Sequence, residues 1–330
     1  MVKLSVSTYF TGALWRQGSR RAFSQMSKAC SEKSSPQITA ALEDLKTRKI
    51  NTTRLLNPFQ TELLETSLAE LGLPITLGLP EPGQKLFPHA HSIYFGACTP
   101  ESGLDSDGYG KAFAPPAPPF SERVISSGRL EFNSENWLEI GQEVNLTNSC
   151  NKVTQGFSQS RGNSIAVEQK KVYENSKGLS LTEFRTITYF EPMPRAPRPS
   201  TANSQTPRPA KWNLMVLPTP VLLFRYSAVT FNAHRIHYDT AYCREVENYP
   251  DCLVHGPLTC TLALRLLTQA LEGEGRPWAN ALQSFEYRLL RPLFVNRPFT
   301  IKANVESSSA EVWIETKEGL IALKARAQLK

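Results

Sequence analysis

The 330-residue sequence lacks the patterns that mark several common classes of protein. No run approaches the roughly 18 uninterrupted apolar residues of a membrane-spanning helix, and the most apolar segment, 214–224, is interrupted by Pro218 and Pro220. The six cysteines form no C-x-x-C pair, so we expect free thiols and neither a disulfide framework nor a zinc site. A glycine-rich phosphate loop and a metal-ligand spacing are also missing, and the sequence therefore predicts no cofactor and no metal.

Acidic residues are absent from two segments, and this absence accounts for the basic net charge of +7. Residues 1–31 hold five basic side chains and no acid, while residues 192–211 hold four basic side chains and no acid. The rest of the chain then carries a charge of −2. The basic charge is not concentrated in a region that would fold, so we expect no nucleic-acid partner.

The first of these segments, 1–31, has the composition of a mitochondrial transit peptide. It is rich in serine, and its basic residues alternate with apolar and aromatic ones. The sequence Arg21-Ala-Phe-Ser24 resembles a matrix-processing site, and no apolar core of a secretory signal is present. We therefore expect a protein of the mitochondrial matrix, with an untargeted basic tail as the alternative.

The second segment, 192–211, contains six prolines and predicts a linker between two folded regions. In the first region we expect helices at 40–49 and 60–71, a loop at 96–119, and strands between 123 and 190. In the second we expect a strand at 222–230, a short helix at 240–247 capped by Asp239, a long apolar helix at 257–271, and strands at 284–290, 299–307, 311–316 and 320–329. A buried helix wrapped by an antiparallel sheet is a hot-dog arrangement.

Three of the five histidines, His234, His237 and His255, lie within 22 residues. The first two belong to the segment Phe231-Asn-Ala-His-Arg-Ile-His-Tyr-Asp239, which aligns without gaps with the pattern G-D-x-N-P-x-H-x-D of the MaoC-like hydratase/dehydratase superfamily. Within it the segment most resembles the mitochondrial hydroxyacyl-thioester dehydratase type 2 branch. The resemblance is specific over 226–298 and weaker over 55–190.

This resemblance implies an α+β double hot-dog fold, in which antiparallel sheets are each wrapped around a central helix. Residues 36–191 would form a degenerate N-terminal half, and residues 212–330 would form the catalytic C-terminal half. The fused halves would supply the pair of helices that single hot-dog subunits obtain by dimerising. A monomer and a homodimer of such chains both remain open.

The resemblance also assigns roles to the motif residues. The catalytic histidine of the family falls on His237, and its catalytic aspartate falls on Asn232, which cannot exchange a proton as a carboxylate does. We expect His237 to take the C2 proton of a 3-hydroxyacyl thioester and return it to the leaving hydroxyl. The N–H of Gly256 would stabilise the thioester oxygen, and Asn232 would orient the hydroxyl or a water molecule.

Three further residues are expected to contact the substrate, each with a structural alternative. Arg235 would bind a phosphate of the carrier arm or form an ion pair. His234 would contact the substrate or pack in the core, and His255 would contact the substrate or begin the long helix. Structural roles also remain open for His237, as a buried histidine, and for Gly256, as a tight turn.

The activity implied by the resemblance is dehydration of (R)-3-hydroxyacyl thioesters to trans-2-enoyl thioesters. The expected partner is the acyl carrier protein of mitochondrial type II fatty-acid synthesis, or a coenzyme A thioester. One alternative is hydration of a small acyl-CoA such as mesaconyl- or itaconyl-CoA at the same site. Another, suggested by Asn232, is a protein that binds acyl thioesters without catalysis.

Overall fold

The computed structural model describes residues 36–116, 118–158, 161–192 and 209–330. The expected transit peptide, 1–31, and most of the expected linker, 193–208, lie outside the described residues. Within the described part, no helix is long and apolar enough to cross a membrane. The five cysteines that fall in this part are free thiols.

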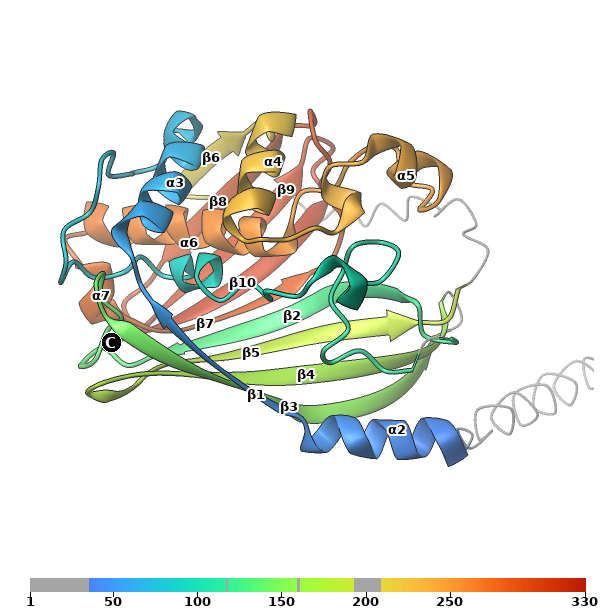
Figure 1. The fold of residues 1–330 in the computed structure, drawn as a ribbon. Coiled ribbons are helices and arrows are strands. Elements are labelled where there is room, and N and C mark those ends of the chain that lie inside the picture. Colours follow the sequence, from blue (N-terminus) through green and yellow to red (C-terminus); the bar gives the residue numbers. More distant parts are fainter. Residues whose placement is uncertain (1–35, 117, 159–160, 193–208) are drawn as a thin grey trace, which may run out of the picture.

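One antiparallel sheet of ten strands runs through the molecule, in the order β1-β3-β4-β5-β2-β7-β10-β9-β8-β6 (Figure 1). Its strands are β1 (Lys49–Leu55), β2 (Glu122–Phe132), β3 (Glu143–Ser158), β4 (Gly162–Asn175), β5 (Gly178–Phe190), β6 (Trp212–Val216), β7 (Leu282–Leu289), β8 (Phe299–Val305), β9 (Ser309–Thr316) and β10 (Ile321–Leu329). The first five strands precede the proline-rich segment and the last five follow it. They meet where β2 pairs with β7, with Gly128 opposite Tyr287.

Most of the helices form a second layer above part of this sheet, whereas α2 lies apart from them beside β3 (Figure 1). The helices are α2 (Pro36–Thr47), α3 (Pro58–Leu68), α4 (Pro220–Val229), α5 (Thr240–Glu245), α6 (Gly256–Gly273) and α7 (Trp278–Ala281), with 3-10 turns η1 (Ala69–Leu71), η2 (Ala90–Ile93), η3 (Glu101–Gly103) and η4 (Arg235–His237). The expected helices at 40–49, 60–71, 240–247 and 257–271 correspond to α2, α3 with η1, α5 and α6. Asp239 caps α5, as expected, because its side chain accepts a hydrogen bond from the Tyr242 amide.

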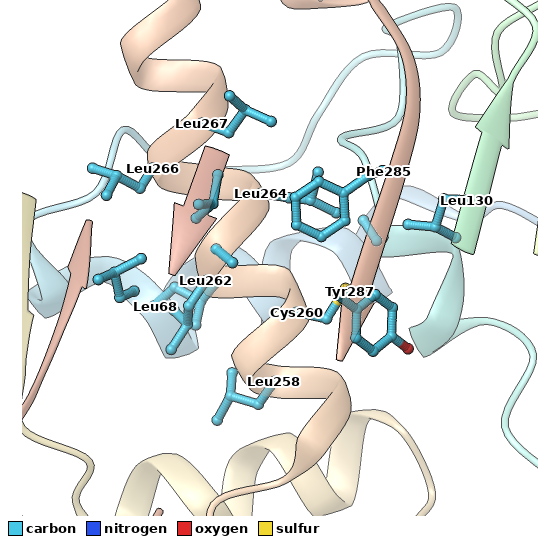
Figure 2. Close-up of a cluster of buried hydrophobic side chains, with 14 of the residues drawn as sticks. Leu68, Leu130, Leu258, Cys260, Leu262, Leu264, Leu266, Leu267, Phe285 and Tyr287 are labelled. Carbon is cyan, nitrogen blue, oxygen red and sulfur yellow. The ribbon is translucent and has the colours of Figure 1, made fainter. Parts of the chain in front are cut away.

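The long helix α6 forms the centre of the C-terminal core. Its leucines are buried on several sides, and Figure 2 shows them beside Phe285 and Tyr287 of β7 and Leu130 of β2. Full burial of one such side chain contributes about 1.5–3 kcal/mol. A helix that is apolar around its circumference must be covered on all sides, and the strands β8 and β9 cover one side of α6. The expectation of a buried helix wrapped by an antiparallel sheet is confirmed.

The strand expected at 222–230 is wrong, because this segment is the helix α4. Thr219 caps the helix by accepting a hydrogen bond from the Leu222 amide, and Pro220 occupies the first turn. A proline there removes no helical hydrogen bond and starts a helix rather than breaking one. Leu222, Leu223 and Tyr226 are buried on one helical face.

The N-terminal strands are covered differently from the C-terminal ones. Among the described residues before 193, the longest helix is α2 with 12 residues, compared with 18 in α6. The helix α3 packs beside α4 in the helical layer (Figure 1). One face of β3, β4 and β5 instead borders a cavity whose opposite wall includes residues of α4 and of the segment that follows it. This arrangement places the histidine motif beside open space.

Candidate active site

The histidine motif lies between α4 and α5, and its backbone is held in a special conformation. Phe231 has a φ of 51°, in the left-handed region that favours glycine. The superfamily pattern has glycine at this position, because glycine adopts a positive φ without steric cost. The Asn232 amide then donates to the Ser227 carbonyl at 2.8 Å, so the motif folds back against the end of α4.

His237 is buried and has one defined hydrogen bond. Its Nδ1 lies 2.9 Å from the carbonyl oxygen of Leu253, and because a carbonyl only accepts, Nδ1 carries the proton. Burial lowers the pKa of His237 to about 3, and the neighbouring His234 adds to this shift. The ring is therefore neutral at physiological pH, with an unprotonated Nε2 that can accept a proton.

His255 stacks directly on His237. The two ring centroids are 3.7 Å apart, with 19° between the planes. His255 precedes α6 at its N-cap position but makes no side-chain capping bond, and its Nε2 lies 2.8 Å from the Ser227 hydroxyl. Burial, followed by the charges of His237 and His234, keeps the pKa of His255 well below its usual range. His255 is fully buried, and Ser227, to which it is hydrogen-bonded, lines the cavity.

Asn232 borders the cavity and has one end of its side chain occupied. Its Oδ1 accepts a hydrogen bond from the His234 amide at 3.1 Å, which is a local turn of the motif. The NH2 group is therefore the part of the side chain that can bind a ligand, and it can only donate. This geometry suits orientation of a hydroxyl oxygen and excludes proton abstraction by Asn232.

His234 is held by a residue from the N-terminal half of the chain. Its Nε2 donates to the carboxylate of Asp107 at 3.2 Å, and its ring lies edge-on to that of His237 with centroids 5.5 Å apart. Asp107 also forms an ion pair with Arg123. Burial alone would raise the pKa of Asp107, but the hydrogen bond and charge of His234, together with Arg123, lower it to about 2. A fixed negative charge thus lies behind the histidine motif.

The loop that carries Asp107 fits closely against the motif backbone. The Arg235 amide donates to the Asp107 carbonyl at 2.8 Å. Gly108 has a φ of 81°, and a Cβ at this position would overlap the carbonyl of Ala233. Only glycine satisfies both conditions at once. In the sequence this stretch is recognisable only as a loop, and no local pattern marks Asp107, Arg123 or Ser227 as site residues.

Arg235 borders the cavity and forms the ion pair that was one of its two expected roles. Its Nη2 lies 2.8 Å from Asp239 Oδ2, four residues along the chain, and its guanidinium lies over the Tyr242 ring. The pKa of Arg235 is raised, chiefly by the hydrogen bond to Asp239. The side chain remains 40% exposed, so a contact with a carrier arm is compatible with this ion pair.

Gly256 is the first residue of α6, so its N–H has no acceptor within the helix. The N–H can therefore donate to a partner from outside the helix, and its role as a donor to a thioester oxygen stays a prediction. The absence of a side chain at Gly256 also affects the packing of α6 against the sheet. A Cβ at Gly256 would come within 2.7 Å of Leu289 Cδ1, and Ile125 lies next nearest. A larger residue at this position would therefore displace the end of the Leu289 side chain.

The cavity beside these residues has a volume of about 1140 Å³. Of the predicted site residues, Asn232 and Arg235 line it. His234, His237, His255 and Gly256 lie behind this wall, and they connect to it through Ser227, which bonds His255, and through Pro257, which follows Gly256. In the described part of the chain, no group of three or more His, Cys, Asp or Glu side chains is arranged to hold a metal ion.

Removing the charge of Asp107 is expected to lower kcat about 10- to 100-fold, because His234 and the motif backbone would lose a fixed partner and shift relative to His237. Asp107→Asn tests this, since the amide keeps the size of the carboxyl group. Asp105→Asn is the matched control: Asp105 lies in the same loop and also pairs with Arg123, but no contact with His234 is found. Steady-state kinetics of both variants measure the effect, and equal rates for the two would contradict it.

Comparison with known proteins agrees with the geometry. A sequence profile of the hydroxyacyl-thioester dehydratase type 2 family matches residues 89–295. The chain is 33% identical to mesaconyl-C(4)-CoA hydratase of Chloroflexus aurantiacus, over 76% of this chain and 86% of that protein. It is 31% identical to the mitochondrial hydroxyacyl-thioester dehydratase type 2 of Schizosaccharomyces pombe, over 70% of this chain and 80% of that protein.

Solved structures support the fold. A MaoC-like dehydratase from Phytophthora capsici superposes with a TM-score of 0.64 at 14% identity, covering 87% of this chain and 97% of that one. A Mycobacterium tuberculosis protein described as having a double hotdog fold superposes with a TM-score of 0.51 at 14% identity, over 88% and 98% of the two chains. The expected double hot-dog fold is confirmed, and the chain belongs to the hydroxyacyl-thioester dehydratase type 2 family.

Proposed function

We propose that this protein is a hydro-lyase that dehydrates (R)-3-hydroxyacyl thioesters to trans-2-enoyl thioesters. The observation that carries the proposal is His237, a neutral buried imidazole whose tautomer is fixed by Leu253 within the family motif. A protein that only binds thioesters does not need an imidazole with a free Nε2 held in this way. The family match and the relative from Schizosaccharomyces pombe support the same activity.

The reaction uses one proton that returns to the substrate. His237 Nε2 takes the proton from C2, the C2–C3 double bond forms, and the bond between C3 and its hydroxyl oxygen breaks. The same proton passes from Nε2 to the departing hydroxyl, which leaves as water. The Gly256 N–H and the positive end of α6 stabilise negative charge on the thioester oxygen while C2 lacks its proton.

Asn232 and Asp107 support this step in different ways. Asn232 lines the cavity, and its NH2 group, which the local bond of Oδ1 leaves unused, donates a hydrogen bond to the C3 hydroxyl and so fixes the direction in which the hydroxyl leaves. Asp107 holds His234 beside His237 through the contact between its carboxylate and His234 Nε2. The superfamily pattern has a carboxylate at position 232. In this chain Asn232 supplies a hydrogen-bond donor there, and the carboxylate comes instead from Asp107 of the N-terminal half.

The test is the interconversion of defined thioesters by the full chain. We expect (R)-3-hydroxybutyryl and longer (R)-3-hydroxyacyl thioesters to yield trans-2-enoyl products, and the (S) isomers to remain unreacted. Acyl carrier protein and coenzyme A forms of the same acyl group decide the carrier, for which we propose the acyl carrier protein of mitochondrial fatty-acid synthesis. A folded protein that converts neither isomer on either carrier would contradict the proposal.

A second candidate is hydration of a small acyl-CoA of the mesaconyl or itaconyl type. The 33% identity to a mesaconyl-C(4)-CoA hydratase favours it, and the same residues run the reaction in the direction of water addition. Initial rates with these two acyl-CoA esters, measured beside those with straight-chain enoyl thioesters, separate the candidates. Sedimentation of the same preparation distinguishes a monomer from a homodimer.

We further propose that residues 1–31 direct import into the mitochondrial matrix and that 192–211 link the halves 36–191 and 212–330. The basic, acid-free composition of 1–31 supports import, as do two mitochondrial relatives. A fluorescent reporter fused to residues 1–31 is expected to enter mitochondria, and Arg20→Ala with Arg21→Ala is expected to reduce its import. Lys3→Ala, which lies far from the processing-like sequence, serves as the single-charge control. A reporter that stays in the cytosol would contradict the assignment.

A further inference from the structure

The wall of the cavity opposite the motif carries a second group of ionisable side chains. Lys171 on β4 and Glu183 and Arg185 on β5 all line the cavity. Arg185 Nη2 lies 2.6 Å and Lys171 Nζ lies 3.5 Å from Glu183 Oε1. Their side chains are only 13% (Lys171), 2% (Glu183) and 15% (Arg185) exposed. The proposed dehydration assigns no role to this group.

The group holds more positive than negative charge. Glu183 is its carboxylate, and the Oε2 atom of Glu183 already accepts from the Tyr173 hydroxyl at 3.0 Å and lies 3.3 Å from His91 Nε2. Burial lowers the pKa of His91, so this imidazole is neutral. Burial and the charge of Arg185 lower the pKa of Lys171 to about 8, so Lys171 is still mostly protonated at pH 7. Two cations therefore face one anion.

The group of Lys171, Glu183 and Arg185 has a hydrogen-bond donor that no protein group uses. Arg185 Nε is buried without a hydrogen-bond partner in the protein. A buried positive charge in excess is costly unless an anion compensates it. Asn148 and Gln169 line the same wall and add polar groups beside the two cations. The wall thus presents an incomplete ion-pair network to the cavity.

The position of the group indicates which part of a ligand would reach it. Phe224, Phe231 and Tyr238 line the same cavity but are 65%, 66% and 52% exposed, so they mark its open side. A large carrier must remain on the open side, so the far end of the acyl group points toward the buried side. A phosphate of the carrier arm is correspondingly expected near the opening.

Tyr226 connects the cavity with the histidine group. It lines the same cavity as Lys171 and Arg185, and its ring lies edge-on to that of His255 with centroids 5.0 Å apart. One cavity therefore borders both the histidine group and the two cations.

We propose that Lys171 and Arg185 form a subsite for a carboxylate at the far end of the acyl group. The preferred substrates would then be thioesters of short dicarboxylic acids. Guanidinium and ammonium groups bind carboxylates through charge-assisted hydrogen bonds, and Arg185 has the planar arrangement of donors that suits such a group. This inference rests on the second candidate of the proposed function and deepens it, because mesaconyl and itaconyl groups end in a carboxylate, whereas the straight-chain acyl groups of fatty-acid synthesis do not.

The experiment compares two coenzyme A thioesters that differ only at the far end. One is trans-but-2-enoyl-CoA, which ends in methyl, and the other is the trans-butenedioyl mono-thioester, which ends in carboxylate. We expect wild-type kcat/KM for hydration to favour the carboxylate by about 10- to 100-fold. Lys171→Met and Arg185→Met are each expected to reduce this ratio at least about tenfold. Lys171→Met leaves the Glu183–Arg185 pair intact, so it provides a folded variant.

Lys170→Met is the matched control. Lys170 is the next residue on β4, its side chain lies near the Phe184 ring rather than in the cavity wall, and the ratio should not change. A wild-type ratio near one, or an unchanged ratio in both cavity variants, would overturn the subsite while leaving dehydration intact. An equal rise in KM for both thioesters would show binding of a carrier phosphate and would also overturn it. Failure to hydrate either thioester would instead contradict the proposed function.

Discussion

Replacing His237 by asparagine is expected to lower kcat for dehydration by about 10²- to 10⁴-fold, the usual contribution of a positioned acid or base. The asparagine NH2 group can still donate to the Leu253 carbonyl, as Nδ1 does in the native protein. No atom of the new side chain takes the place of Nε2. The substitution therefore removes proton transfer while keeping the local hydrogen bond, and KM should change much less than kcat.

The control for this variant is another buried histidine. His89 lies outside the motif, and its Nδ1 is 2.8 Å from the Thr261 hydroxyl of α6. His89→Asn should therefore keep a rate close to that of the native protein. If His237→Asn retained the native rate, the chemistry would lie elsewhere; if native protein bound thioesters without converting them, the non-catalytic alternative would hold.

The pH dependence of kcat/KM in the same assay tests the protonation state of His237. Because burial lowers the pKa of His237 to about 3, the imidazole is already neutral throughout the range from pH 6 to 8. The acidic limb of kcat/KM reports the pKa of the essential base in the free enzyme. No loss of kcat/KM with a midpoint near pH 6.5 is therefore expected from this residue. A limb with that midpoint would show that His237 is solvated in the working enzyme.

Features that depend on neighbouring residues were predictable from the sequence. The apolar circumference of α6, the proline in its first turn and the cap at Asp239 are all local signals, and the structure contains each of them. The segment 222–230 shows where such signals compete. Pro220, just before this segment, interrupts an apolar run in the sequence, whereas together with Thr219 it marks the start of α4.

Features that depend on distant contacts were not predictable. Asp107 lies in a loop with ordinary turn residues, and only the folded chain brings its carboxylate to His234. Glu183 and Arg185 occupy alternate positions on β5, and Lys171 of β4 lies opposite Glu183; charged residues in such positions usually mark a solvent-facing side of a sheet. Here that side faces the cavity, because no helix of the length of α6 covers it among the described residues. The identity of the covering element, rather than the strand itself, determines what such residues do.

The folded protein is expected to lose stability steeply between pH 7 and 5. Four imidazoles, those of His89, His91, His237 and His255, are buried and have lowered pKa values, with burial as the largest cause in each case. In the unfolded chain each returns to a pKa near 6.5. The unfolded state therefore takes up protons that the folded state excludes, so the stabilisation is intact above about pH 6.5 and is lost as the pH falls below it.

Each such imidazole lowers the free energy of unfolding by roughly 2 kcal/mol between pH 7 and 5 if it stays neutral in the folded state. The contribution of His91 should be smaller than the others because Glu183 partly offsets its burial. The carboxyl groups of Asp107 and Glu183 have lowered pKa values and so add losses only at more acidic pH. Since whole domains are stable by about 5–15 kcal/mol, the histidines alone can bring the protein close to unfolding at pH 5.

Urea unfolding followed by tryptophan fluorescence at pH 7, 6 and 5 measures this loss. His89→Asn removes one of the four imidazoles, so the slope of the unfolding free energy below pH 6 should become shallower by up to about 1.4 kcal/mol per pH unit. An exposed acid replaced by its amide, such as Glu135→Gln, should leave the slope unchanged. A free energy of unfolding that stays constant from pH 7 to 5 would mean that the buried imidazoles bind protons in the folded protein. In that case the neutral state of His237, on which the proposed proton transfer depends, would also be contradicted.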